Sequence, residues 1–381
     1  MTSGTFARRR LTAALAGFAV AVGGAAVPAR AQTPAADREI LPPALVRDLE
    51  QVIEEAVVVA AESARQSIAA IDLDRTIRHA LEARPGAAQN RGRIERSDRS
   101  TRTVALGANG LLDLRNVSGD ITVTAGGGRD VVIEILEQSR ASNESDAALG
   151  LKEVEVAIDH RGERAIVETR YPRRRTPYDV TTSYVVTAPA GTRLNARSVS
   201  GDIVVRGLKG DLTVNTVSGT IRVNDAGRIS EARSVSGSVT LADVTTDGAV
   251  NSGTVSGDIE LTRLRAVRVT AENVSGRIRA DGVTSDGVLM KSLSGTVDFS
   301  GPLSRNGRYE LQSHSGTVRL AVTGTVGFEL QAQSFSGRIR PEGLSLQSIS
   351  MNRGALRATV GDGSAVVIAT TFSGDVVVGR K

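Results

Sequence analysis

The sequence contains no cysteine and no tryptophan, and aromatic residues make up 3% of its 381 residues. The absence of cysteine excludes disulfides, thiol catalysis, thiolate metal sites and the cysteine-linked lipid of a bacterial lipoprotein. Because aromatic side chains are so few, buried area must come from Val, Ile, Leu and Ala, which suits flat, repetitive stacking. Histidine is scarce as well, with His79, His160 and His314 as its only copies.

An excess of charge of one sign is also lacking. The chain has 47 basic and 42 acidic residues, a formal net charge of +5. This mild charge predicts no nucleic-acid partner. Beyond the N-terminus no apolar run is long enough to cross a bilayer, so we expect no transmembrane span in the processed chain.

Residues 1–31 have the pattern of a signal peptide. Arg8-Arg9-Arg10 is followed by the apolar run Leu11–Val27 and by Ala29-Arg30-Ala31, a small-x-small cleavage pattern. A retained membrane anchor is the alternative, but the run is short and ends at a cleavage pattern. We therefore expect export, with a mature chain beginning at Gln32 in the periplasm, outside the cell or on its surface. The arginines leave the general and twin-arginine export routes open.

A leader and a helical segment are predicted over residues 32–83. Apolar and small residues recur at steps of four and three over residues 44–83, which predicts an amphipathic helix; they are Leu45, Leu49, Val52, Ala56, Val59 and Ser63. This helix could pack on its own chain or form a short coiled coil. Residues 84–102 are rich in arginine and are predicted to be a linker, either solvated or in peripheral contact with anionic headgroups.

The remainder of the chain is predicted to be β-structure in two parts. Residues 103–190 form an irregular strand-rich part with a short helix near Asn143–Leu151 and a basic loop at Arg173-Arg174-Arg175. Its expected strands are Val131–Leu136, Val154–Ile158, Ala165–Thr169 and Ser183–Thr187. Residues 191–381 form the repetitive part.

The repeat is a Ser-Gly step that occurs ten times. Its serines are Ser118, Ser200, Ser218, Ser236, Ser256, Ser275, Ser294, Ser315, Ser336 and Ser373. From Ser200 the spacings are 18, 18, 20, 19, 19, 21, 21 and 37, the last predicted to be two periods with one degenerate copy. A fixed period of this length predicts a solenoid with coils of about 18–21 residues.

Aligning the repeats gives columns with distinct physical roles. Three residues after each serine stands Ile or Val, and two residues later nine of ten residues are apolar, which predicts a strand with one buried face. Two residues before each serine stands only Asn, Ser or Thr, which we expect to form hydrogen-bonded ladders with one another. The glycine after the serine predicts a turn with positive φ.

These motifs resemble a known family. The Val-Ser-Gly-Asp-Ile step, the Leu-x-Val strand after Lys209-Gly210-Asp211, and Ala188-Pro189-Ala190-Gly191 are similar to the bacterial "putative adhesin" family of unknown function, over residues 103–381. The resemblance implies a right-handed parallel β-helix in a protein of the cell envelope.

The sequence points to a scaffold, and we predict no catalytic, cofactor-binding or metal-binding residue. Nucleophilic catalysis needs one activated serine with an oriented base, whereas the motif serines are ten equivalents. Acids follow the Ser-Gly step only at Asp120, Asp202, Asp258 and Asp375. We expect an adhesin-like binding module that presents polar columns to an envelope protein or polysaccharide. A polysaccharide-processing enzyme and a periplasmic accessory of a signalling or stress system remain alternatives.

Overall fold

The computed structural model of the chain describes residues 93–172 and 174–381. Residues 1–92 lie outside the described residues. They contain the predicted signal peptide, the leader, the helical segment over 44–83 and residues 84–92 of the predicted linker. Among the described residues no helix has the length and apolarity needed to span a membrane.

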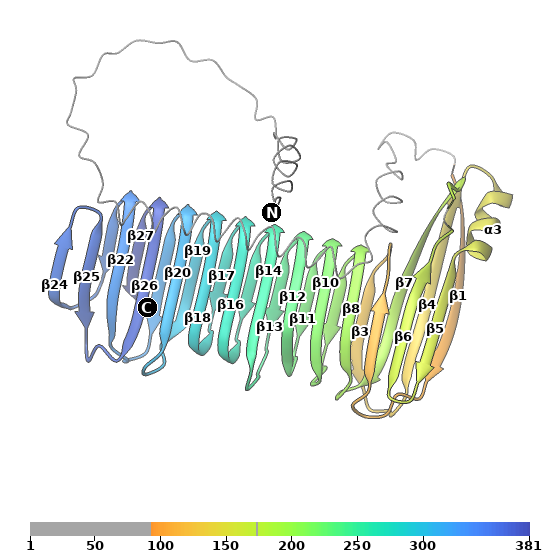
Figure 1. Cartoon of the computed structure of the whole chain (residues 1–381), viewed down its shortest axis with the longest axis horizontal. Helices are drawn as coiled ribbons and strands as arrows, with labels where there is room; N and C mark the ends of the chain where they lie inside the picture. The colour runs from red at the N-terminus through yellow and green to blue at the C-terminus, as the bar shows by residue number, and fades with distance from the viewer. Residues whose placement is uncertain (1–92, 173) are drawn as a thin grey trace, which may run out of the picture. The chain divides into compact units, whose positions relative to one another are not determined.

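Two long sheets hold the described strands (Figure 1). Sheet A has 13 strands in the spatial order β1 (Ile94–Val104), β4 (Val131–Ala141), β7 (Tyr178–Pro189), β3 (Ile121–Gly126), β9 (Ile203–Arg206), β11 (Ile221–Asn224), β13 (Val239–Ala242), β15 (Ile259–Thr262), β17 (Ile278–Asp281), β19 (Val297–Pro302), β21 (Val318–Thr323), β27 (Val376–Arg380) and β23 (Ile339–Glu342). Sheet B has 14 strands in the order β5 (Glu155–Arg161), β6 (Arg164–Arg170), β2 (Leu111–Arg115), β8 (Arg193–Ser200), β10 (Asp211–Ser218), β12 (Arg228–Ser236), β14 (Ala249–Ser256), β16 (Arg265–Ser275), β18 (Thr284–Ser294), β20 (Arg308–Ser315), β26 (Ala365–Ser373), β22 (Phe328–Ser336), β25 (Ala355–Val360) and β24 (Leu346–Asn352).

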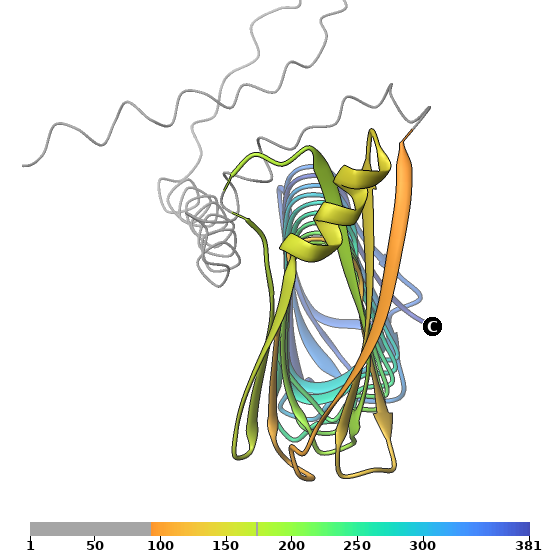
Figure 2. The ribbon, with the colours of Figure 1, turned by 90° about the vertical axis from the view of Figure 1, so that its right-hand side faces the viewer.

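Each Ser-Gly step joins one strand of sheet B to one strand of sheet A and so makes one coil. Equivalent residues of neighbouring coils lie side by side in parallel register; Ile221, for example, pairs with Ile203 on one side and Val239 on the other. Figure 2, which looks along the stack from its N-terminal end, shows the coils lying behind one another. The predicted β-solenoid is confirmed.

The core lies between the two sheets and consists of the predicted columns. The Ile/Val column and the column two residues later are buried in every coil except the one that contains Ser336, where Ile339 and Pro341 are half-buried. A further inward column, eight residues after the serine, was not predicted: it contains Leu208, Ala226, Val244, Leu264 and Val283. These residues fill the second turn of the five coils that begin at Ser200, Ser218, Ser236, Ser256 and Ser275.

The second turn has a more regular backbone than its sequence indicated. The residue before the inward apolar one has a positive φ in five successive coils: Gly207, Asp225, Asp243, Arg263 and Gly282. Asp and Arg hold at this position a conformation that glycine adopts most easily. The turn is therefore conserved in shape from coil to coil while its residues vary.

The coil order in space differs from the order in the sequence at the C-terminal end. The last coil, β26–β27, pairs with β20–β21 on one side and with β22–β23 on the other. The 37-residue interval was predicted to contain a degenerate coil, and this is wrong: it contains β24 and β25, which pair antiparallel. We number the coils one to ten in spatial order by their serines: Ser118, Ser200, Ser218, Ser236, Ser256, Ser275, Ser294, Ser315, Ser373 and Ser336.

The N-terminal end is closed by antiparallel strands and a helix. β1 pairs with β4 and β4 with β7, while α3 (Glu144–Glu153) packs on them, with Asn143 as its N-cap. The predicted helix and the four predicted strands of this part are confirmed. The linker prediction is wrong for Ile94–Arg102, which lie in β1; the exposed charges of this edge strand resemble those of a linker in the sequence. Coil one, β2–β3, pairs with coil two, so residues 103–190 share both sheets with the repeats.

Candidate functional site: the Ser-Gly ridge

Each motif glycine lies against the backbone of the neighbouring coil. A Cβ atom built on Gly219 would be 2.0 Å from the carbonyl oxygen of Gly201, and one on Gly237 would be 2.0 Å from that of Gly219. All ten glycines make such an approach to a backbone oxygen, but φ is positive only at Gly119, Gly201, Gly257, Gly276, Gly316 and Gly374. The predicted positive φ therefore holds for six copies, while close stacking explains all ten.

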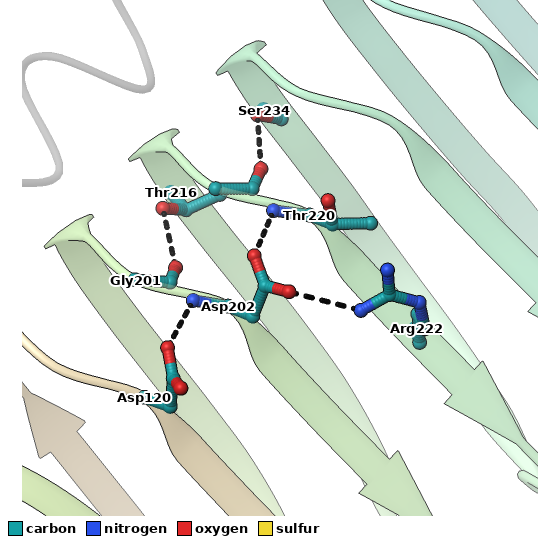
Figure 3. Close-up of polar contacts among 8 residues, drawn as sticks. Asp120, Gly201, Asp202, Thr216, Thr220, Arg222 and Ser234 are labelled. Carbon is teal, nitrogen blue, oxygen red and sulfur yellow. Dashed lines mark hydrogen bonds and ion pairs between the residues drawn. The ribbon is translucent and has the colours of Figure 1, made fainter.

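The Asn/Ser/Thr column two residues before each serine is buried in all ten coils. Seven of its ten side chains donate to the glycine carbonyl of the neighbouring coil, for example Ser234 Oγ to Gly219 O at 2.9 Å and Thr254 Oγ1 to Gly237 O at 2.8 Å (Figure 3 shows the first of these). The expected side-chain ladders are thus wrong, because the glycine carbonyl at the turn is the nearer acceptor. Being buried, this column cannot meet a partner.

The aspartates of the Ser-Gly-Asp steps also bind backbone. Asp120 Oδ1 accepts the N–H of Asp202, and Asp202 Oδ1 accepts the N–H of Thr220, both at 2.8 Å (Figure 3). Asp258 and Asp375 do the same for Arg277 and Arg338, at 2.7 and 2.9 Å. All four carboxylates therefore join one coil to the next, which is a structural role.

Asp202 shows what this environment does to a carboxyl group. Burial acts to raise its pKa, while the Thr220 N–H and the Arg222 guanidinium, 3.0 Å away, act to lower it. The hydrogen bonds prevail, so the pKa lies below its ordinary value. The group is held ionised and is unsuited to general acid catalysis.

Two parallel rows of side chains remain accessible along this corner of the solenoid. The motif serines form one row and are exposed in nine of ten coils. The residues directly before them form the second row, apolar and mostly half-buried: Val117, Val199, Val217, Val235, Val255, Val274, Leu293, His314, Phe372 and Phe335 in spatial order. We call these two rows the Ser-Gly ridge. The sequence places Val, Leu or Phe directly before nine of the ten motif serines, but it does not show that this row stays accessible.

The ridge ends in a stack of three aromatic rings. Phe372 lies between His314 and Phe335, with ring centroids 5.0 and 4.7 Å apart and interplanar angles of 14° and 13°. The sequence could not place these rings together, because Phe372 belongs to the coil inserted between the other two. His314 therefore packs as a member of an apolar row, as its position in the repeat indicated.

The three histidines do not form a catalytic group in the described part of the chain. His79 lies outside the described residues. His160, exposed on β5, contacts the carbonyl oxygen of Gly162 at 2.8 Å, and His314 is in the aromatic stack. Within residues 93–172 and 174–381 no cluster of three His, Asp or Glu side chains has a geometry suited to a metal ion.

Two open hollows lie away from the ridge. One, of about 550 Å³, is lined by Arg102–Ala105 of the β1 end and by Val156, Ile158 and His160 of β5. The other, of about 310 Å³, lies beside Val267 and includes Arg265, Ser285 and Asp286. Neither brings together a nucleophile, a base and an oriented partner.

Three of the six described arginines in the two basic segments form ion pairs with acids. Arg93 and Arg96 form ion pairs with Asp179 and Glu144, and Arg174 forms one with Glu153. On the outward face of sheet A, charges of both signs alternate through Glu260, Arg279, Asp298 and Arg319. This face is therefore not strongly basic.

Comparison with known proteins finds one matching family model and several solved structures of low sequence identity. The model of the Toastrack DUF4097 family matches residues 112–379. No curated protein matches the sequence. Among solved structures, a "putative adhesin" from Bacteroides fragilis is 11% identical, with 74% of this chain and 97% of that chain covered and a TM-score of 0.35. A "putative adhesin" from Parabacteroides distasonis is 11% identical, with 74% and 97% covered and a TM-score of 0.34. A "putative cell adhesion protein" from Clostridium sporogenes is 8% identical, with 75% and 100% covered and a TM-score of 0.20.

Proposed function

The chain belongs to the Toastrack DUF4097 family, and from this membership and the Ser-Gly ridge we propose that it is an exported, non-enzymatic binding module of the cell envelope, adhesin-like in function. Export is supported by the basic head, apolar run and Ala-x-Ala pattern of residues 1–31. Its partner is an extended envelope molecule, a polysaccharide or a protein.

The observation that carries the proposal is the ridge itself. Exposed hydroxyls and half-buried apolar side chains run beside each other over ten coils and end at Phe335. At about 4.8 Å per coil, this surface extends over roughly 40 Å. A long row of similar small contacts suits an extended partner that is bound at many places with little energy at each.

The engagement of the four aspartates supports a scaffold rather than an enzyme. Each already accepts a backbone N–H from the next coil. A polysaccharide-hydrolysing enzyme of the usual kind needs two acids facing each other across a cleft with their carboxylates free to act on substrate. The periplasmic accessory role uses the same binding surface and differs only in the partner.

The test is binding of the mature chain, residues 32–381, to envelope polysaccharide and envelope protein fractions. Changing Val217, Val255 and Leu293 together to lysine should weaken binding at least about tenfold, whereas each single change should stay within a few-fold. The matched control changes Thr240, Thr262 and Ser300, on the outward face of sheet A, to lysine.

A glycan-degradation assay on the same samples decides between scaffold and enzyme. Ser256→Ala, Asp258→Asn and His314→Ala should each leave binding within a few-fold, and no degradation is expected. A robust degrading activity abolished by one of these substitutions would overturn the proposal, as would equal binding by the ridge variant and its control.

A further inference from the structure

The C-terminal end of the solenoid leaves part of its core face uncovered. Sheet B continues beyond coil ten through β25 and β24, whereas sheet A stops at β23 (Figure 1). Leu346 and Met351 of β24 pair with Val360 and Leu356 of β25 and so lie on the same face as these core residues. Leu356 is 1% exposed, but Met351 is 65% exposed.

Exposed apolar side chains gather at this end. Six large apolar side chains are exposed among the described residues, and Phe335, Ile349 and Met351 all lie in coil ten or β24. The others, Ile94, Val185 and Val267, lie singly elsewhere. Scattered exposed apolar residues are normal, whereas a group at one end of a protein marks a contact surface.

The outer edge of β24 is interrupted by an irregularity between Gln347 and Ser350 but lacks charge and proline, the other common protections against strand pairing. Its seven residues, Leu-Gln-Ser-Ile-Ser-Met-Asn, include no charge and no proline. β5, the opposite edge of the same sheet, carries Glu155, Asp159 and Arg161, and β23 carries Arg340, Pro341 and Glu342. Charges and proline on an edge strand prevent pairing with another chain.

We propose that two copies of the chain dimerise through this end, with β24 of one copy pairing antiparallel with β24 of its partner across a twofold axis. The absence of charge on β24 points to a second copy as the partner, because two identical uncharged edges meet without repulsion. Head-to-tail stacking would instead place it against the charged β5. Antiparallel pairing of identical strands also closes the assembly at two copies, whereas head-to-tail stacking would not close.

The dimer would cover the exposed side chains of β24 in both copies. Ile349 and Met351 would each lie near the same residues of the partner and be removed from water. The Ser-Gly ridges would remain accessible, because they lie along the corner of the solenoid and the contact uses only its end. The inference therefore does not depend on the proposed function.

Light scattering with gel filtration of the mature chain tests the proposal at tens of micromolar. The wild type should have twice the mass of one chain, and Met351→Asp or Ile349→Asp should weaken dimerisation at least about tenfold, because both copies bring the charge to the interface. Val267→Asp is the control, since its side chain is 52% exposed away from this end. Circular dichroism melting should show that all variants remain folded.

Cross-linking gives an independent measurement that does not depend on a disruptive variant. Because the chain has no cysteine, Ser350→Cys should give a dimer with a short bismaleimide, while Ser97→Cys on β1 should not. A monomeric wild type, or a dimer unaffected by both aspartate variants, would overturn the proposal. So would a monomer that dimerises only after removal of residues 32–92, since that segment would then be covering β24.

Discussion

A methyl group at Gly237 would lie 2.0 Å from the carbonyl oxygen of Gly219, a distance that requires the backbone to move. The glycine is therefore fixed by its neighbouring coil more than by its own φ, which is not in the positive range. We expect Gly237→Ala to destabilise the protein by about 3 kcal/mol, at the upper end for an overpacked site.

The control for this substitution is Gly127→Ala, because a Cβ at Gly127 meets nothing within 4 Å. It should leave stability almost unchanged. Urea unfolding midpoints of the two variants make the comparison. Equal losses would show that stacking does not determine the glycine column.

At this scale the sequence predicted which side chains are buried but not where their hydrogen bonds go. Step-of-two periodicity and ten aligned copies were enough to identify the Ile/Val column. For the Asn/Ser/Thr column, the sequence offers two acceptors in the neighbouring coil: the equivalent side chain and the glycine carbonyl. Only the geometry of the turn, where the glycines approach closely, selects the carbonyl.

At the scale of the elements, the aspartate-to-backbone hydrogen bonds join each coil to its neighbour in the stack. Asp202→Ala removes the acceptor of the Thr220 N–H and should cost about 1 kcal/mol at neutral pH. The loss is modest because the carboxylate is partly exposed and solvent compensates. Asp202→Asn should keep part of the bond through its amide oxygen.

The pH dependence of that difference has a definite sign. Because the folded pKa of Asp202 is lowered, its contribution is present above the unfolded value of about 3.9 and is lost as pH falls through the folded pKa. The stability gap between the wild type and Asp202→Ala should therefore shrink in acid. Asp247→Ala, whose ion-paired carboxylate is 89% exposed, should show almost no gap at any pH.

At the scale of the whole molecule, a C-terminal truncation removes coil nine, which is internal in the stack, and leaves coil ten, which is at its end. A chain ending at Asp362 lacks β26 and β27, which separate coil eight from coil ten. We expect the loss to spread to β22–β25, because β22 and β23 would lose their only parallel neighbours and β25 and β24 are attached through β22. Hydrogen exchange should show lost protection over residues 328–360 as well as fewer protected amides in β20 and β21.

The matched control deletes residues 346–352, which removes only the edge strand β24. That variant should keep its protection in β26 and β22. Retained protection of β22 in the truncated chain would mean that coil ten can dock directly on coil eight. The truncation would then act as the removal of an ordinary terminal repeat.

The coil order could not be predicted from the sequence for a reason inherent to repeats. Every coil presents nearly the same edge, so the Ser373 coil fits beside Ser315 or beside Ser336 by pattern alone. The aromatic stack of His314, Phe372 and Phe335 was missed for the same reason. Fold class and core columns depend on local periodicity, while the ends of the stack depend on long-range choice among equivalent partners.

Because the Ser373 coil lies between two coils that precede it in the sequence, the order of synthesis also affects how the chain folds. The chain is synthesised from its N-terminus. Coils one to eight can add successively, each on an edge already made. Coil ten then emerges before coil nine, when the parallel edge on which it pairs does not yet exist, so β22–β25 stay undocked at this stage. They dock only after residues 365–381 have emerged and formed coil nine, so folding of this end of the solenoid has a slow step that the other coils lack.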